Sequence, residues 1–182
     1  TIIDKIEHTS WLYNYLDTLH YGTLLYLRFA GYSDIAIGFA LLLGFRVMEN
    51  FNLPFLASNI VDFWRRWHIS LSTWCKDYVY VPVLSFTRVH FIAALASMIV
   101  LGIWHEMSWR YLLWGAFHGL GIAVCQRWQR TEMAKTLLNN RTWTFIAFLI
   151  TQNFVIFSFT FTGLDTMQQT IDRWYILFGF LP

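Results

Sequence analysis

The apolar run at residues 23–45 constrains the fold of this chain more than any other part of its sequence. A helix of this length, rising about 1.5 Å per residue, crosses a bilayer hydrocarbon core of about 30 Å. The composition agrees, because hydrophobic residues make up 57% of the chain and charged residues only 13%. Arg28 and Asp34 interrupt the run, and charges at that depth usually face protein or a wet cavity instead of lipid. We therefore expect an all-α, polytopic integral membrane protein.

Further helices are predicted on both sides of this run. Three more apolar stretches predict spans, at residues 91–104, 109–126 and 142–162. Two segments of mixed polarity predict interfacial or re-entrant helices, at residues 2–18 and 60–78. In the second segment, aromatic and apolar side chains recur every three or four positions, at Trp64, Trp67, Leu71, Trp74 and Tyr78. Asn59 and Ser108 are predicted N-caps, and the pair Gly115 and Gly119 predicts a close helix contact.

The basic residues predict an orientation for this single membrane-embedded region, residues 1–182. Arg46, Arg65, Arg66, Lys76, Arg88, Arg127, Arg130, Lys135 and Arg141 fall in two connections that must share a side, which the positive-inside rule makes cytoplasmic. Both ends are then expected outside. The chain opens at Thr1 on a charged segment, so we expect no signal peptide and read the chain as a fragment of a larger protein.

His105 is the first candidate for chemistry, because it ends the short run 91–104. That run is roughly 21 Å long as a helix, so His105 is predicted to lie within the bilayer. An ionisable residue at such depth is a functional candidate, and an uncharged imidazole accepts and returns a proton. The alternative is a structural ring bonded to a backbone carbonyl, and the residues alone leave both interpretations open.

The other polar candidates each have a structural interpretation that the residues alone favour. His68 lies on the aromatic stripe of 60–78, where a structural hydrogen bond explains it. His118 lies beside the glycine pair and is explained by packing. Arg65 and Arg66 fit the anchoring of lipid phosphate better than the binding of a phosphate-bearing coenzyme.

Several functional classes lack the residues that they need. His105 and Glu106 begin like the zinc motif HExxH, but Trp109 takes the place of the second histidine, and Cys75 and Cys125 have no close partner. We therefore predict no metal. The net charge of +2, without a dense basic face, predicts no nucleic-acid partner. Neither a GxSxG nucleophile elbow nor a phosphate loop is present in the sequence, which argues against serine hydrolases and nucleotide triphosphatases.

An ordered set of motifs resembles the membrane-bound O-acyltransferase family. The segments are GYSDIAIG at 31–38, ENFNLPF at 49–55, FWRRWHISLSTW at 63–74, DYVYVP at 77–82, GIWH at 102–105 and WGAFHG at 114–119. The residues of these motifs are most similar to those of the branch of alginate O-acetylases and related polysaccharide acetylases. They more distantly resemble the D-alanyl transfer protein of teichoic acid synthesis. The resemblance covers roughly residues 22–162.

The resemblance implies a ring of membrane helices around a tunnel, with His105 as the active-site histidine and His68 as the second. It implies transfer of an acyl group, in the first place acetyl, from a thioester to hydroxyls of a cell-surface or secreted polysaccharide. Our hypothesis is that His105 is the general base and that nearby groups position the substrates. The substrate-binding candidates are Trp64, Trp67, Ser72, Trp104, Asn52 and His118, and the donor-binding candidates are Arg65 and Arg66.

The same resemblance implies the ligands, partners and location. We expect no tightly bound cofactor, and acetyl-CoA or an acyl-carrier thioester as co-substrate. The expected partners are membrane lipid, the polysaccharide acceptor and proteins of envelope biosynthesis, at a bacterial inner membrane. Three features depart from the family pattern: Glu106 stands where this branch commonly has glycine, residues 82–91 lack the usual Gly- and Lys-rich loop, and the amino-terminal half of a typical member is absent.

Two alternatives stay open at the level of sequence. One is a non-enzymatic membrane protein, either a transporter subunit or a scaffold of a polysaccharide-export complex, in which the histidines relay protons or pack. Repeated helix pairs would favour a transporter, and the sequence has none. The other is a truncated, inactive remnant of the enzyme.

Overall fold

The computed structural model describes residues 10–137 and 140–180, and within these ranges the chain is helical with no strand. The elements in chain order are α2 (Trp11–Leu42), the 3-10 turn η1 (Pro54–Leu56), α3 (Ile60–Arg66), α4 (Ile69–Cys75), the π-helical turn η2 (Lys76–Tyr80), α5 (Val81–Thr87), α6 (His90–His105), α7 (Trp109–Trp128), α8 (Glu132–Leu137), α9 (Arg141–Thr162) and α10 (Met167–Leu177). The expected all-α class is confirmed.

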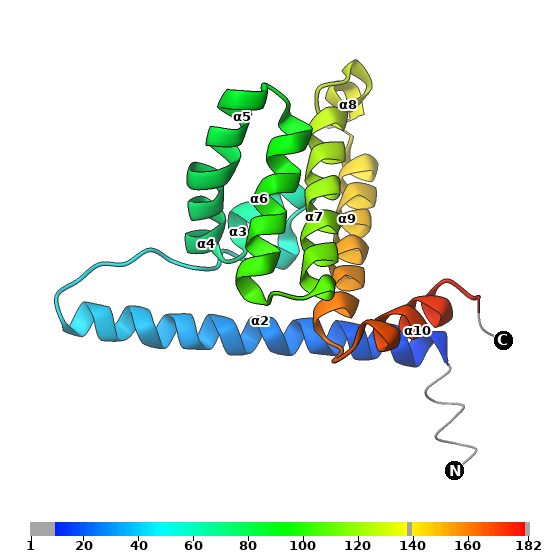
Figure 1. Cartoon of the computed structure of the whole chain (residues 1–182), viewed down its shortest axis with the longest axis horizontal. Coiled ribbons are helices and arrows are strands. Elements are labelled where there is room, and N and C mark those ends of the chain that lie inside the picture. Colours follow the sequence, from blue (N-terminus) through cyan, green and yellow to red (C-terminus); the bar gives the residue numbers. More distant parts are fainter. Residues whose placement is uncertain (1–9, 138–139, 181–182) are drawn as a thin grey trace, which may run out of the picture.

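The helices form an upright group that stands on one long helix (Figure 1). The helices α6, α7 and α9 lie side by side, and the continuous rod of α4, η2 and α5 packs against α6. The long helix α2 runs across the lower ends of this group, and α10 lies beside the first turns of α2. The core lies where α2, α3, α7 and α9 meet, and its large buried rings are Phe63, Trp64, Trp67, Trp114, Phe159 and Phe161.

The hairpin of α6 and α7 is held by direct contact between backbones. A Cβ added to Gly115 would lie 2.3 Å from the carbonyl oxygen of Met98, and one added to Gly119 would lie 2.9 Å from the Cα of Leu95. On α6, a Cβ at Gly102 would lie 2.2 Å from the carbonyl oxygen of Tyr111. The close approach predicted from the glycine pair is therefore confirmed, because only hydrogen fits at these positions.

Both predicted N-caps are present in the structure. The side chain of Asn59 accepts a hydrogen bond from the backbone N–H of Asp62 at 2.9 Å, which caps α3. The side chain of Ser108 accepts from the backbone N–H of Tyr111 and caps α7. These bonds satisfy N–H groups that have no partner within a helix.

The segment predicted as one helix over 60–78 is divided in the structure. The first part, α3, ends at Arg66, and a new helix begins at Ile69 and continues through η2 to Thr87. The physical reason is a competing backbone partner. The N–H of Asn52 donates to the carbonyl of Arg66 at 3.0 Å, and the N–H of Ile69 donates to the carbonyl of Asn50 at 2.9 Å.

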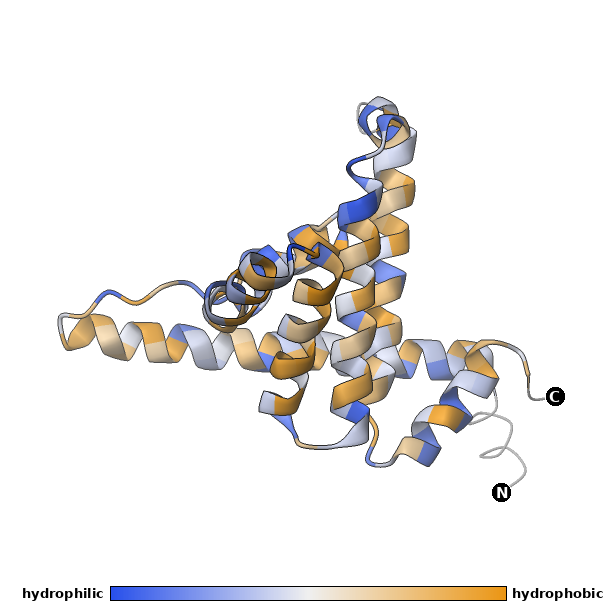
Figure 2. Ribbon diagram, turned by 45° about the horizontal axis from the view of Figure 1, so that its top comes forward, coloured by the Kyte–Doolittle hydropathy of each residue, from blue (hydrophilic) through white to orange (hydrophobic). Residues whose placement is uncertain are grey.

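The long helix α2 joins two segments that the sequence analysis separated. It runs without a break from Trp11 to Leu42, across the gap expected between 2–18 and 23–45; residues 1–9 lie outside the described chain. Among the described residues, α2 and α9 are long and apolar enough to cross a membrane, and α6 is a shorter apolar helix. Apolar residues are spread along all three (Figure 2). Because α2 runs across α9, the two do not both follow the membrane normal, and the set of four spans stays a prediction.

The carboxy-terminal helix α10 is fixed to the start of α2 by polar contacts. Arg173 donates to the carboxylate of Asp17 at 2.9 Å and to the hydroxyl of Thr18 at 3.2 Å. The indole N–H of Trp11 donates to the carbonyl of Leu177 at 3.0 Å. The two ends of the described chain therefore lie together at the lower side of the upright group (Figure 1).

The glycine contact between α6 and α7 generates a stability prediction. We expect Gly115→Ala to lower the free energy of unfolding by about 1–3 kcal/mol, because the new methyl group forces two backbones apart. The matched control is Gly38→Ala, since a Cβ at Gly38 in α2 meets nothing within 4 Å. Thermal unfolding of the full-length protein in detergent measures both, and equal melting temperatures for the two variants would contradict the contact.

Candidate active site

His68 occupies the break between α3 and α4 in a strained backbone conformation. Its φ of 45° and ψ of 55° lie in the left-handed region, which non-glycine residues seldom adopt. The backbone hydrogen bonds of Arg66 and Ile69 to the segment 50–52 fix this conformation from both sides. Such conformations persist where the surrounding structure over-determines them, and they cluster at functional sites.

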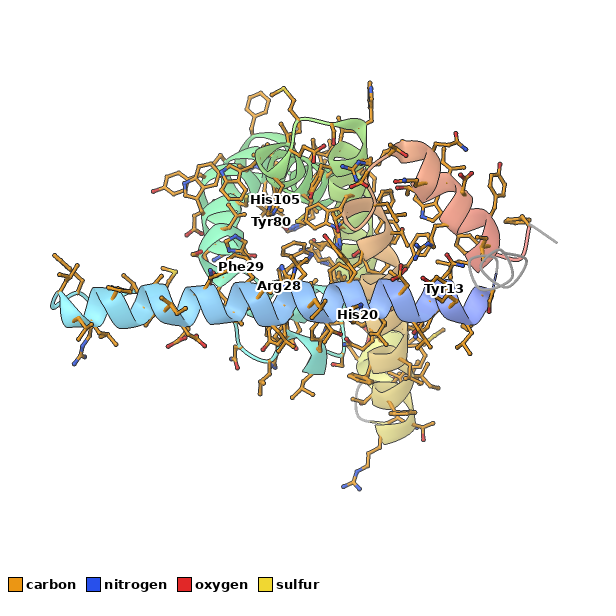
Figure 3. The ribbon with its side chains drawn as sticks, turned by 90° about the horizontal axis from the view of Figure 1, so that it is seen from below. Tyr13, His20, Arg28, Phe29, Tyr80 and His105 are labelled. Atoms are coloured by element: carbon orange, nitrogen blue, oxygen red, sulfur yellow. The ribbon has the colours of Figure 1, made fainter. Side chains whose placement is uncertain are left out.

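His105 is the last residue of α6, at the turn that leads into α7. Its ring centroid lies 5.0 Å from that of Trp104, 5.8 Å from Trp114 and 6.0 Å from Tyr111. The ring of His68 is 6.3 Å away. Seen from below, Phe29 lies on the side of α2 that faces His105 (Figure 3). Two histidines that are 37 positions apart in the sequence therefore share one site.

A small cavity of about 110 Å³ joins these two rings to the aromatic core. Its lining includes five of the residues predicted from the sequence, namely His68, His105, Trp64, Trp67 and His118. Residues of α2 and α9 complete it, among them Phe29 and Ser158. His105 itself is exposed in the described chain.

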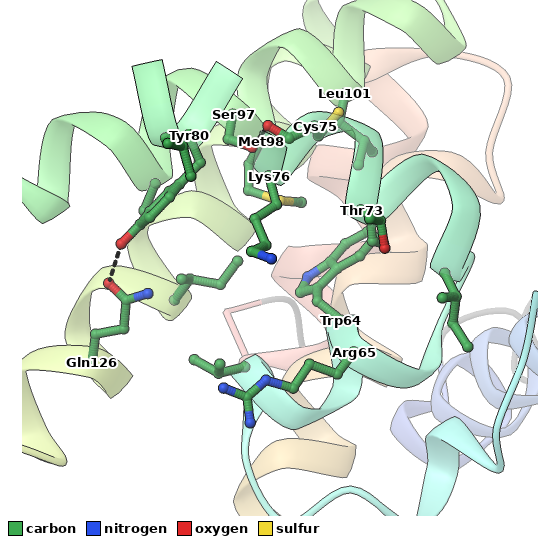
Figure 4. Close-up of a pocket in the computed structure, with 16 residues that line it drawn as sticks. Trp64, Arg65, Thr73, Cys75, Lys76, Tyr80, Ser97, Met98, Leu101 and Gln126 are labelled. Atoms are coloured by element: carbon green, nitrogen blue, oxygen red, sulfur yellow. Dashed lines mark hydrogen bonds between the residues drawn. The ribbon is translucent and has the colours of Figure 1, made fainter. Parts of the chain in front are cut away.

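A larger cavity of about 470 Å³ lies on the other side of Trp64. Arg65 and Ser72, both predicted from the sequence, line it together with Lys76. The side chains of Lys76 and Arg65 both extend into this space, and Tyr80 donates to Gln126 at its edge (Figure 4). The buried indole of Trp64 lines both cavities and is the wall that they share.

His118 holds that indole in place. The indole N–H of Trp64 donates to Nδ1 of His118 at 3.3 Å. An indole N–H can only donate, so Nδ1 is the acceptor and the proton of the neutral ring is on Nε2. The side chain of His118 is 1% exposed and packs against the rings of Trp114 and Phe154. The structure thus gives His118 a packing and hydrogen-bonding role at the wall of the site.

Three of the predicted site residues lie outside both cavities. Arg66 donates to the carboxylate of Asp62 at 2.9 Å, so its guanidinium is paired within α3. Asn52 is exposed and uses its backbone N–H to bind the carbonyl of Arg66. Trp104 is 61% exposed, although its ring lies 6.3 Å from that of His68.

Glu106, which stands where the resembled branch commonly has glycine, pairs with a nearby residue in the structure. Both carboxylate oxygens of Glu106 accept hydrogen bonds from Nη2 of Arg110 at 3.5 Å, one helical turn away. Arg110 also donates to the carbonyl of Phe161 at 3.4 Å. The carboxylate next to His105 is therefore paired with a guanidinium that is anchored on α9.

The electrostatics favour an uncharged His68. Burial, followed by the proximity of His105, lowers the pKa of His68 to about 4. His68 therefore has a free lone pair on one ring nitrogen at neutral pH. Across the residues that the structure describes, no cluster of His, Cys, Asp or Glu could hold a metal ion.

Sequence reasoning missed three residues of the site. Asn50 contacts the ring of His68, Phe29 lies edge-on to it at 4.7 Å, and Tyr111 lines the small cavity. Asn50 lies within the motif at 49–55, from which the sequence predicts only Asn52 as a site residue. No sequence pattern indicated Phe29 as a site residue, because phenylalanine is common in apolar runs.

Comparisons with known proteins agree with the motifs. Residues 5–167 match the sequence profile of the membrane-bound O-acyltransferase family. The chain is 41% identical over 146 residues to "Probable alginate O-acetylase AlgI" of Azotobacter vinelandii, which covers 79% of this chain and 29% of that protein. It is 35% identical over 172 residues to the peptidoglycan O-acetyltransferase of Helicobacter pylori, covering 92% of this chain and 32% of that protein.

A third relative is named for the transfer of a different acyl group, D-alanyl. The teichoic acid D-alanyltransferase of Bacillus subtilis is 35% identical over 171 residues, covering 86% of this chain and 42% of that protein. The chain therefore spans less than half the length of each of these three relatives.

The hydrogen bond between Trp64 and His118 generates a second stability prediction. We expect His118→Phe to lower the free energy of unfolding by about 1–3 kcal/mol, because the buried indole N–H loses its acceptor. His20→Phe is the control, since His20 is exposed on α2. Thermal unfolding of the full-length protein, followed by tryptophan fluorescence, compares the two variants. A melting temperature for His118→Phe at or above that of the parent would refute a structural role for this bond.

Proposed function

The chain belongs to the membrane-bound O-acyltransferase family, and from this we propose that the protein moves an acyl group, in the first place acetyl, from a thioester to a polysaccharide hydroxyl. The observation that carries the proposal is the pair of rings of His105 and His68, 6.3 Å apart at one cavity. That separation is short enough for one acceptor oxygen to contact both rings.

We propose that His105 is the general base. It removes the proton from the acceptor hydroxyl while the oxygen attacks the thioester carbonyl. A C–O bond forms, the C–S bond then breaks, and the proton returns from the imidazolium of His105 to the leaving thiolate. The unprotonated ring nitrogen of His68 accepts a hydrogen bond from a second sugar hydroxyl beside the reacting one and so orients the acceptor, and Trp67 and Trp64 form the apolar floor.

The larger cavity is the proposed place of the thioester donor. Acetyl-CoA and acyl-carrier thioesters both carry phosphate on a narrow arm, and Arg65 supplies a cationic group at this cavity. Lys76 supplies a second one, although its ammonium also lies 3.5 Å from the carboxylate of Asp77. Arg66 is less available, because it is paired with Asp62. The acyl end of the donor would then lie against Trp64, next to the histidine cavity.

The acceptor and the setting are proposed from the relatives. The names of the three relatives specify alginate, peptidoglycan and teichoic acid as the polymers that they modify. We propose an envelope or secreted polysaccharide as acceptor, partner proteins of envelope biosynthesis, lipid contacts along the apolar helices, and an inner-membrane location. The described helices would be one sector of a ring around a tunnel, completed by the rest of the protein.

Removal of His105 tests the proposal directly. We expect His105→Ala to lower kcat for acetyl transfer by about a hundredfold to ten-thousandfold, which is the usual contribution of a positioned acid–base group. The measurement is transfer of isotope-labelled acetyl from a thioester to polymer by the full-length protein in membranes. His20→Ala is the control. Transfer by His105→Ala at the parental rate would remove His105 from this role.

Substitutions at the two neighbouring arginines distinguish a residue that binds the donor from one that is paired within α3. We expect Arg65→Ala to raise KM for the thioester donor about tenfold, because a charge-assisted contact to phosphate is lost. Arg66→Ala should leave that KM within about twofold of the parent, because its guanidinium pairs with Asp62. Donor titrations at saturating acceptor measure both values. A larger rise for Arg66→Ala than for Arg65→Ala would contradict the placement of the donor.

A further inference from the structure

The side chain of Asn50 reaches His68 from a distant part of the sequence. Its Oδ1 lies 3.2 Å from Nδ1 of His68 and 2.9 Å from the hydroxyl of Ser70, which donates to it. The backbone N–H of Ser70 also donates to Oδ1, at 3.3 Å. On its other side, Nδ2 of Asn50 donates to the hydroxyl of Ser33 on α2 at 3.2 Å.

These partners determine which way the amide group of Asn50 points. A backbone N–H can only donate, so the amide atom that faces Ser70 must be the oxygen. If the amide were turned over, its NH₂ group would face the N–H of Ser70, and two donors would oppose each other. The contact to His68 is therefore made by an oxygen that can only accept.

The proton on His68 follows from this orientation. Because Oδ1 of Asn50 only accepts, Nδ1 of His68 must be the nitrogen that carries hydrogen. The hydroxyl of Ser70 does not compete, since its proton goes to Asn50 at 2.9 Å and it lies 3.5 Å from Nδ1. A neutral imidazole protonated at Nδ1 has its lone pair on Nε2.

Both Asn50 and the ring of His68 are held in place. The carbonyl of Asn50 accepts from the N–H of Ile69, which joins its backbone to the residue after His68. The ring of Phe29 lies edge-on to the imidazole with an interplanar angle of 86°. The left-handed backbone conformation at His68 further restricts where its ring can lie. The amide and the ring thus meet in one arrangement.

We propose that Asn50 is a positioning residue that keeps His68 in its Nδ1–H tautomer, so that Nε2 is the nitrogen offered to the substrates. The catalytic consequence rests on the proposed acyl transfer, while the tautomer itself does not. When Nε2 accepts a hydrogen bond or a proton, the Nδ1–H bond to Asn50 is retained and gains strength from the charge. His68 therefore acts in one defined orientation, as an orienting carbonyl or carboxylate achieves for other functional histidines.

The tautomer is measured by nitrogen NMR of the full-length protein labelled with ¹⁵N-histidine. His68 is assigned by the signals that disappear in His68→Gln. At neutral pH we expect a protonated Nδ1 and an unprotonated Nε2 in the parent. Asn50→Asp keeps an accepting oxygen at the same place and should keep this tautomer. Asn50→Leu, of similar size, removes the acceptor and should give a mixture of both tautomers or the Nε2–H form.

Kinetics provide the second readout. We expect Asn50→Leu to lower kcat about tenfold or more with the donor KM unchanged, and Asn50→Asp to restore most of that loss. Thermal unfolding shows whether Asn50→Leu is folded; if it is not, the parent and Asn50→Asp spectra alone decide. An Nε2–H signal for His68 in the parent, or a tautomer unaffected by Asn50→Leu, would overturn the inference. Absence of thioester-dependent transfer in the parent would instead overturn the proposed function and leave the tautomer result standing.

Discussion

The backbone contact between α6 and α7 determines where His105, the proposed general base, lies. Gly102 and Gly115 let two helices approach until carbonyl oxygens touch the opposite Cα positions, and no larger residue fits there. Gly102 lies one turn before His105 and contacts the carbonyl of Tyr111. The contact therefore places the last residue of α6 against the first turns of α7, where Trp114 lines the cavity.

His68 reaches the same place by a different means. The segment 50–52 donates one backbone hydrogen bond to Arg66 and accepts one from Ile69, which interrupts the helix and turns the chain at His68. The side chain of Asn50 then fixes the ring, and Phe29 of α2 closes the other side. One histidine is thus positioned by helix packing and the other by a loop, and the two meet at the lower end of the upright group.

The sequence predicted the parts of this site that depend on local patterns. The two histidines, the caps at Asn59 and Ser108 and the glycine pair all had a recognisable motif or spacing. The break at His68 had none, because the apolar period continues across it and no glycine or proline marks it. Asn50 was missed for a related reason: its partners come from α2 and α4, and a single sequence does not show which distant segments pair. The same limit applies to the course of α2 across the bundle.

The shared wall at Trp64 has a consequence for how specificity can change in such a protein. Because one indole lines both cavities and donates a hydrogen bond to the buried ring of His118, its size and tilt affect both spaces. A smaller residue at position 64 would merge two spaces of about 110 and 470 Å³. In the proposed acyl transfer, a smaller side chain at position 64 that admitted a bulkier acyl group would enclose the polymer hydroxyl less tightly.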